Sequence, residues 1–217
     1  MITGSIVALV TPMLPDGAID KEGLATLIEY HIQSGTAALG IAGTTGESAT
    51  LTMAEHIDII QFAVEQAAGR IPVVAGTGSN STHEAIELTV AAAAAGAEYS
   101  LLVTPYYNKP PQEGLYRHFC QVAAAVNIPI ILYNVPSRTG VDLSSETVLR
   151  LSEVGNIAGL KDATGDVERG GALIAKLPDT FGVYSGDDAT ALDLMCRGGR
   201  GNVSVTANVA AAKVAEV

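Results

Sequence analysis

The sequence predicts an α/β fold, and specifically a closed (β/α)8 barrel, because three observations agree. Eight short apolar runs recur along the chain, and amphipathic segments lie between them. Runs that are apolar throughout are typical of parallel strands covered on both faces. The first run leads into Thr11 and Pro12 without the G-x-G-x-x-G motif that often follows the first strand of an open doubly wound sheet. Eight alternations therefore favour one barrel domain over residues 1–217.

The elements can be assigned in order along the chain. The predicted strands cover residues 5–10, 37–41, 73–75, 100–103, 129–133, 157–161, 182–185 and 201–204. Two helical segments open with Ser/Thr-x-x-Glu, at residues 52–55 and 81–84, so we expect a capping box at each. Gly96 follows an alanine-rich stretch and is expected to end a helix. The sequence stops at VAAAKVAEV, so we expect a truncated eighth helix.

Composition restricts the classes of partner. The chain carries 23 acidic and 12 basic residues, a net charge of −11, and has no basic cluster. Nucleic acids and anionic membranes are therefore poor partners. Cys120 and Cys196 lack the spacing of metal ligands, and two cysteines suit a reducing cytoplasm. The N-terminus has no basic region typical of a signal peptide. We expect a cytoplasmic protein without a metal.

In such a barrel, functional groups gather at the C-terminal ends of the strands. The polar segments that follow the predicted strands are GTTGES (43–48), TPYYNKP (104–110), YNVPSRTG (133–140), KD (161–162), SGDD (185–188) and SVTAN (204–208). We therefore looked for candidate site residues in these segments.

Lys161 ends an apolar run, where an unpaired ammonium is costly to bury. Desolvation in a partly apolar barrel mouth lowers the pKa of a lysine, and the neutral amine can form a Schiff base with a carbonyl substrate. The alternative is an ion pair with Asp162 or another acid at the rim. Tyr133, at the end of the adjacent strand, could transfer a proton, or it could simply pack with its hydroxyl satisfied.

Three further segments suggest binding groups. The hydroxyls and backbone N–H groups of Thr44 and Thr45 could hold a carboxylate near a helix N-terminus, although GTTGE could also be only a tight turn. Arg138 could grip a second carboxylate through two hydrogen bonds, or be a surface arginine. Tyr106 and Tyr107 suit an interface as well as rim packing.

Two histidines, His56 and His83, lie near predicted helix starts, where the ordinary expectation is a solvated side chain. Glu84 is expected to serve as the capping-box glutamate of its helix.

Taken together, GTTGES, TPYYNKP, YNVPSRTG, GLKDATG and SGDD resemble the 4-hydroxy-tetrahydrodipicolinate synthase (dihydrodipicolinate synthase) family over essentially the whole chain. This family belongs to the pyruvate-dependent class I aldolases, which include N-acetylneuraminate lyase. The resemblance implies a Schiff-base condensation of pyruvate with L-aspartate 4-semialdehyde, in lysine and diaminopimelate biosynthesis, without an external cofactor. The alternatives are a related aldolase or lyase acting on a sugar acid, and a truncated non-catalytic chain.

The resemblance also implies roles for single residues. Of the catalytic residues, Lys161 would form the imine and Tyr133 would act as the general acid/base. Thr44 would supply the hydroxyl of a proton relay, and Tyr107 would be a tyrosine shared with the neighbouring subunit. The substrate-binding residues would be Thr45 for pyruvate, Arg138 for the semialdehyde carboxylate, and Gly186 and Val203 through their backbones.

A feedback site for lysine is implied as well. Its residues would be Ser48, Ala49, His56, Asn80, Glu84 and Tyr106. Met53 stands where inhibited bacterial members have a histidine, so we expect weak inhibition. Family members continue beyond this chain into a small helical segment, which is absent here. We expect a dimer or tetramer, because subunit contacts would cover the barrel surface left open.

Overall fold

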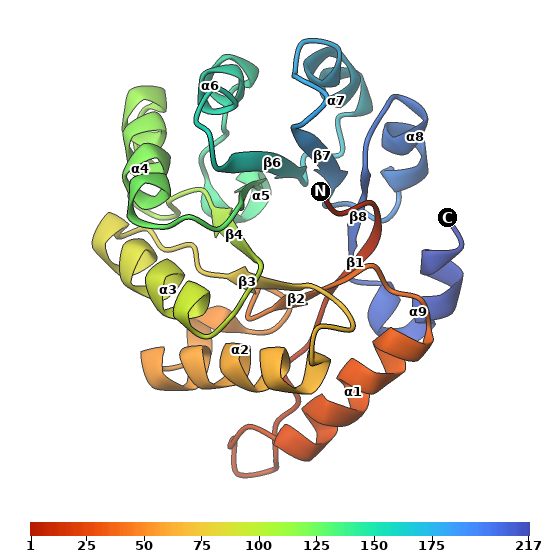
Figure 1. The fold of residues 1–217 in the computed structure, drawn as a ribbon. Helices are drawn as coiled ribbons and strands as arrows, with labels where there is room; N and C mark the ends of the chain where they lie inside the picture. The colour runs from red at the N-terminus through yellow and green to blue at the C-terminus, as the bar shows by residue number, and fades with distance from the viewer.

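The computed structural model describes residues 1–217 and confirms the (β/α)8 barrel. Eight parallel strands pair in sequence order, and β1 pairs with β8 to close the barrel (Figure 1). The strands are β1 (Gly4–Ala8), β2 (Ala38–Ile41), β3 (Val73–Gly76), β4 (Tyr99–Val103), β5 (Ile130–Asn134), β6 (Ile157–Asp162), β7 (Gly182–Ser185) and β8 (Gly201–Ser204). Every predicted strand is present, and its ends lie within two residues of the predicted ones.

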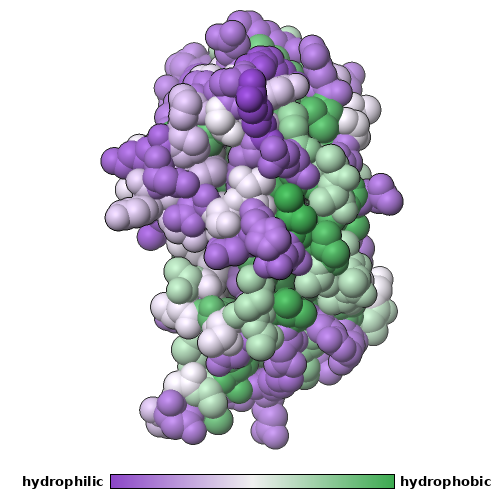
Figure 2. All heavy atoms as spheres, turned by 90° about the vertical axis from the view of Figure 1, so that its left-hand side faces the viewer, coloured by the Kyte–Doolittle hydropathy of each residue, from purple (hydrophilic) through white to green (hydrophobic).

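Helices surround the barrel as an outer ring (Figure 1). They are α1 (Lys21–Gln33), α2 (Met53–Ala67), α3 (Thr82–Ala94), α4 (Gln112–Ala125), α6 (Ser145–Leu151), α7 (Val167–Ile174), α8 (Ala191–Cys196) and α9 (Ala207–Ala215), with a short α5 (Pro136–Thr139) after β5. The last helix, α9, has nine residues and is interrupted at Ala210, which has non-helical backbone angles. The side that carries α3 and α4 mixes hydrophilic residues with a band of hydrophobic ones (Figure 2).

The helix-capping predictions have different outcomes. Thr52 and Glu55 form the complete capping box at the start of α2, and Gly96 has φ +97° just after α3, as a C′ glycine requires. The second predicted capping box is wrong in one half. Ser81 Oγ accepts a hydrogen bond from the Glu84 N–H, but the Glu84 carboxylate accepts a 2.8 Å hydrogen bond from Ser79 Oγ and not from the Ser81 N–H. The reason is that Ser79 Oγ already satisfies the Ser81 N–H.

Strand alternation divides the core into two layers. Within β5, Ile131 and Tyr133 belong to the cluster that fills the barrel, whereas Leu132 packs with residues of the outer helices. In β6, Leu160 also belongs to that outer cluster. The next residue, Lys161, therefore points inward, and it lies opposite Tyr133 in the β5–β6 register. The two residues meet inside the barrel mouth.

Candidate active site

Lys161 is a buried amine without an anionic partner. Its side chain is only 6% exposed, and its Nζ lies 4.0 Å from the centre of the Tyr133 ring. The alternative of a pair with Asp162 is wrong, because no ion pair includes Lys161 and the Asp162 carboxylate accepts from the Thr164 N–H instead. Burial lowers the pKa of Lys161 to about 8, although the charge of Asp188 opposes this. A lysine with this pKa can supply a neutral amine near neutral pH.

Tyr133 lies beside Lys161 with its ring buried. Burial raises the pKa of its phenol, while a hydrogen bond with Thr44 and the charge of Arg138 work in the opposite direction. The phenol therefore stays protonated at neutral pH and has a proton to transfer. The structure thus brings Lys161, Tyr133 and Thr44 together.

The turn that carries Thr44 and Thr45 is held against the end of β1. Thr11 donates a 2.7 Å hydrogen bond to the Gly46 carbonyl, and any Cβ at Gly46 would come within 2.9 Å of the Leu9 carbonyl oxygen. We expected this turn to lie next to a helix N-terminus, but it does not lead directly into an α-helix. A single 3-10 turn (Ser48–Thr50) follows it, and α2 begins only at Met53.

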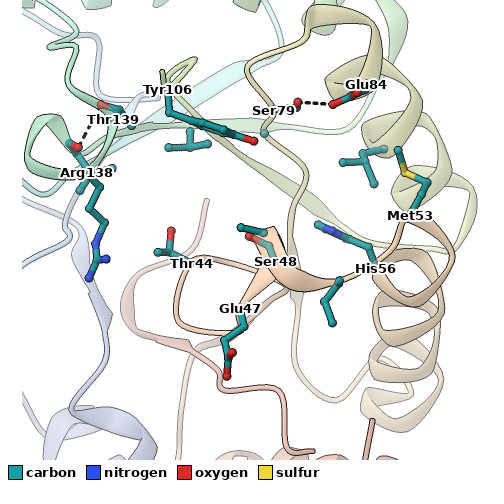
Figure 3. A pocket seen from close by; sticks show the side chains of 16 residues that line it. Thr44, Glu47, Ser48, Met53, His56, Ser79, Glu84, Tyr106, Arg138 and Thr139 are labelled. Atoms are coloured by element: carbon teal, nitrogen blue, oxygen red, sulfur yellow. Dashed lines mark hydrogen bonds between the residues drawn. The ribbon is translucent and has the colours of Figure 1, made fainter. Parts of the chain in front are cut away.

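Arg138 lies on α5, next to Thr139, and its side chain is exposed. Its guanidinium forms no ion pair or hydrogen bond within the chain and projects toward the region of Thr44 (Figure 3). It therefore keeps its donors free for a ligand.

Gly186 and Val203 lie against the reactive pair. A Cβ at Gly186 would approach the Lys161 Cε to 2.9 Å and the Ala163 Cβ to 2.8 Å, so glycine leaves the room that the lysine occupies. Val203 is buried in the same interior cluster as Tyr133.

Tyr107 is the one predicted catalytic residue that the structure does not bring to the others. Its side chain is 87% exposed, and its backbone has φ +71°, which is uncommon for a residue with a Cβ. Tyr107 points away from the core of its own chain.

A cavity of about 410 Å³ opens beside this site (Figure 3). Thr44 and Arg138 line one end, and Met53 and Glu84 lie at the other. Lys161 and Tyr133 are not among the lining residues, so the cavity adjoins the reactive pair instead of enclosing it.

Most of the predicted lysine site lines this cavity. The lining residues include Ser48, Ala49, His56, Glu84 and Tyr106. Asn80 does not line it, and its carbonyl accepts a hydrogen bond from the Asn108 side chain. Sequence reasoning missed Ser79, which turns the Glu84 carboxylate away from the helix end. Two serines close together in GSNSTHE were the only signal of this arrangement.

The expectation that His56 is solvated is wrong. It is 6% exposed, because the first turn of α2 packs it against the end of β3, where its Nε2 lies 2.6 Å from the Gly76 carbonyl oxygen. Burial lowers the pKa of this imidazole, and the contact with Gly76 raises it. His83 is exposed, as expected.

A (β/α)8 barrel with a buried, unpaired lysine beside a buried phenol defines the class of Schiff-base aldolases. The chain belongs to one family of this class, the dihydrodipicolinate synthetase family, whose sequence profile matches residues 1–217.

Individual relatives agree with this assignment. A 4-hydroxy-tetrahydrodipicolinate synthase from Pseudomonas savastanoi pv. phaseolicola is 60% identical over 210 residues, which are 97% of this chain and 72% of the relative. The chloride-inhibited dihydrodipicolinate synthase from Acinetobacter baumannii, complexed with pyruvate, matches with a TM-score of 0.98 at 58% identity, over 100% of this chain and 74% of that one. The enzyme from Cyanidioschyzon merolae with lysine bound matches with a TM-score of 0.95 at 41% identity, over 98% and 73%.

The pKa of Lys161 leads to a first prediction. With a pKa of about 8, the neutral amine is about a tenth of the population at pH 7. The rate of imine formation with pyruvate should therefore rise with pH and level off above about pH 8. The measurement is timed quenching with borohydride and peptide mass spectrometry, with Lys161→Ala as the control. An adduct on Lys109 or Lys176, or a rate still rising at pH 10, would contradict the assignment.

Proposed function

We infer that the chain condenses pyruvate with L-aspartate 4-semialdehyde to give 4-hydroxy-tetrahydrodipicolinate, in lysine and diaminopimelate biosynthesis. The observation that supports this most is the buried, unpaired Lys161 beside Tyr133, in a chain whose relatives carry this activity. The family's enzymes work through a Schiff base on a lysine and take no external cofactor.

The proposed reaction proceeds in the following steps. The neutral Lys161 amine attacks the keto carbon of pyruvate, and water leaves to give the imine. Loss of a methyl proton gives an enamine, whose carbon attacks the aldehyde carbon of the semialdehyde. Tyr133 transfers protons in these steps, with Thr44 as its hydrogen-bonded partner. The amino group of the bound semialdehyde then displaces Lys161 by transimination, which closes the ring and frees the enzyme.

Two carboxylates have to be held for this reaction. We assign the pyruvate carboxylate to Thr45 in the turn after β2, with Gly186 and Val203 shaping the pocket around the imine. The semialdehyde carboxylate is assigned to Arg138, whose donors are free and which lines the adjoining cavity. A free arginine favours a small amino-acid acceptor over a sugar acid, and the comparisons support neither the sugar-acid alternative nor the non-catalytic one.

Substitution of Arg138 separates the two half-reactions. A charge-assisted contact to a carboxylate contributes about 1.5–3 kcal/mol, so Arg138→Ala should lower kcat/KM for the semialdehyde by roughly 10- to 150-fold. Formation of the pyruvate imine should be nearly unchanged. A coupled assay with both substrates tests the function, and borohydride trapping serves as the control. Equal damage to both measurements would contradict the role of Arg138, and imine without turnover in the unmodified enzyme would contradict the function.

We also propose that the cavity is a weak site for lysine. Its polar groups include Glu84, an anion that suits an ammonium, and Tyr106. Met53 lines the same cavity and supplies neither a ring nitrogen nor a charge.

Inhibition by lysine should therefore be weak or absent. Loss of one polar contact weakens a ligand by about 1 kcal/mol, or roughly fivefold. Met53→His should strengthen inhibition by about that factor, and Glu84→Gln should weaken any that exists. The measurement is initial velocity against lysine concentration. Half-inhibition of the unmodified enzyme below millimolar lysine would refute this.

We further propose that the enzyme is cytoplasmic and works as a dimer or larger oligomer. Tyr107 is highly exposed and holds an uncommon backbone conformation, which suits a residue that completes a neighbouring site. Among solved relatives, one that is 38% identical is described as a monomeric variant, so assembly has to be measured. None of the helices is both long and apolar enough to cross a membrane.

Dilution tests the assembly. If Tyr107 serves a neighbouring subunit, specific activity should fall together with the mass measured by light scattering. Tyr107→Phe should lower activity without changing the mass. A monomer that keeps full activity at nanomolar concentration would defeat the proposal.

A further inference from the structure

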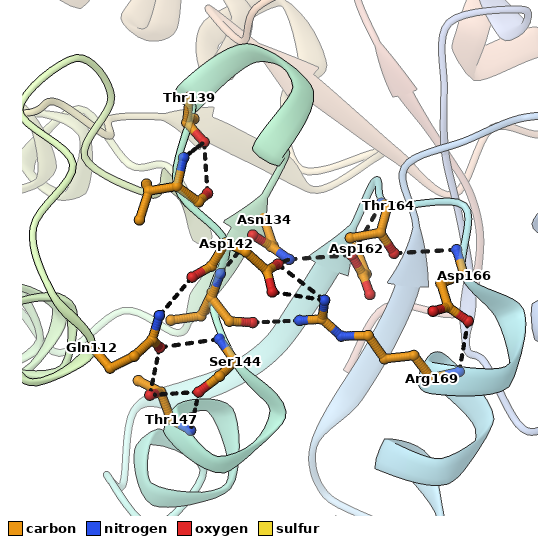
Figure 4. Close-up of polar contacts among 12 residues, drawn as sticks. Gln112, Asn134, Thr139, Asp142, Ser144, Thr147, Asp162, Thr164, Asp166 and Arg169 are labelled. Carbon is orange, nitrogen blue, oxygen red and sulfur yellow. Dashed lines mark hydrogen bonds and ion pairs between the residues drawn. The ribbon is translucent and has the colours of Figure 1, made fainter.

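A polar network lies at the ends of β5 and β6 (Figure 4). It begins at Asn134 and Asp162, the register pair that follows Tyr133 and Lys161 and faces the opposite way. It joins residues from four elements: Gln112 of α4, Asn134 of β5, Asp142 of the following loop and Arg169 of α7. We call these four residues the loop clamp. The reaction as described above uses none of them.

The clamp lies at the base of the loop that carries Arg138. Residues 135–143 leave β5 directly after Asn134 and return to the same side chain. Asn134 is 1% exposed. Its Oδ1 accepts from the Leu143 N–H at 3.0 Å, and its Nδ2 donates to Asp142 Oδ1 at 2.8 Å. One buried amide therefore holds both ends of the loop together.

Arg169 holds the same point from outside. Its Nη1 lies 3.0 and 2.9 Å from the two carboxylate oxygens of Asp142, and its Nη2 donates to the Leu143 carbonyl. The arginine side chain is 23% exposed, so solvent screens this pair less than the other ion pairs of the chain. Gln112 adds a 2.7 Å hydrogen bond to the Asp142 carbonyl.

Arg169 also balances the local charge. Asp142 and Asp162 both lie near Asn134, which donates to each of them. Burial raises the pKa of Asp162, and the positive charge of Arg169 counteracts this rise. Without the arginine, two carboxylates would face each other at the base of the loop, and their repulsion would push the base apart.

Within the loop, the contacts are local. The N–H groups of Arg138 and Thr139 both donate to the Val135 carbonyl, which closes a single helical turn. The guanidinium of Arg138 has no partner, so its position depends on where this turn sits. Val135 and Leu143 anchor the ends of the loop in the two core clusters, and the clamp adds the polar contacts that hold its returning end.

We propose that Arg169 is a positioning residue, which places Arg138 for the carboxylate of the second substrate by holding Asp142 and Leu143. This inference rests on the proposed function, because it concerns the substrate assigned to Arg138. Arg169 touches no reacting atom. Its loss should therefore affect binding of the second substrate and leave imine formation on Lys161 intact.

The test is Arg169→Ala in the full chain. The KM for aspartate semialdehyde should rise by about tenfold, the scale expected when a binding group is misplaced by part of an ångström. The rate of borohydride-trapped imine formation should stay within about twofold. Hydrogen–deuterium exchange in peptides covering residues 135–143 should become faster, because the Leu143 carbonyl loses its Arg169 donor and the Leu143 N–H is then held less firmly against Asn134 Oδ1.

Two variants serve as controls. Arg197 forms two contacts with Glu168, which lies on α7 like Arg169, but this pair does not touch the loop. Arg197→Ala should therefore leave all three readouts unchanged. Arg169→Lys keeps the charge without the planar fork and should recover part of the KM. If Arg169→Ala does not fold, Asp142→Asn keeps the shape, removes the charged pair and should raise the KM by a smaller factor.

An unchanged KM together with unchanged exchange in Arg169→Ala would overturn the inference. Equal losses in imine formation and second-substrate use would also overturn it, since they indicate general destabilisation. If the unmodified enzyme forms the imine but does not use the semialdehyde, the proposed function fails. The exchange experiment then still decides whether Arg169 holds the loop.

Discussion

The site depends on one constraint: an amine has to stay inside an apolar barrel without an anionic partner. A pKa of about 8 in place of 10.5 corresponds to roughly 3 kcal/mol of unfavourable free energy for the buried ammonium. Below about pH 8 the folded and unfolded chains both carry this proton, so folding bears the whole cost. Between pH 8 and 10.5 the folded chain binds fewer protons than the unfolded one, and this contribution therefore becomes less unfavourable as pH rises. The surrounding barrel has to supply that stability.

Successive residues of a strand face opposite sides of the sheet, so the reactive side chains and the polar network that holds the strand ends lie on different faces. Tyr133 and Lys161 are register partners that face the interior, and Asn134 and Asp162 are the next pair in the same register, facing outward. The inner pair holds the amine and the phenol. The outer pair enters the polar network that reaches Arg169. An acid placed directly after Lys161 therefore supports the strand end without pairing with the amine and raising its pKa.

The sequence predicted what depends on local pattern. Continuous apolar runs located all eight strands, and the position of Lys161 at the end of one of them predicted its burial. Longer-range effects were missed. The Glu84 carboxylate does not cap its helix, because Ser79 Oγ donates to it and already accepts from the Ser81 N–H. His56 is buried because its ring meets the Gly76 carbonyl at the end of β3. The clamp joins residues of four elements between positions 112 and 169, and no spacing in the sequence indicates it.

Backbone strain concentrates around the cavity beside the reactive pair. Of the five residues other than glycine with positive φ, Ala42 and Glu47 lie in the segment after β2, and Tyr107 and Lys109 in the one after β4. Such conformations persist only where surrounding contacts hold them. Both segments contribute to the cavity wall, as does Arg138, and Thr44 links that wall to Tyr133. In the proposed lysine site, a ligand that changes the position of Thr44 or Arg138 would change the affinity for the substrate, and by linkage the substrate would change the affinity of the cavity for its ligand.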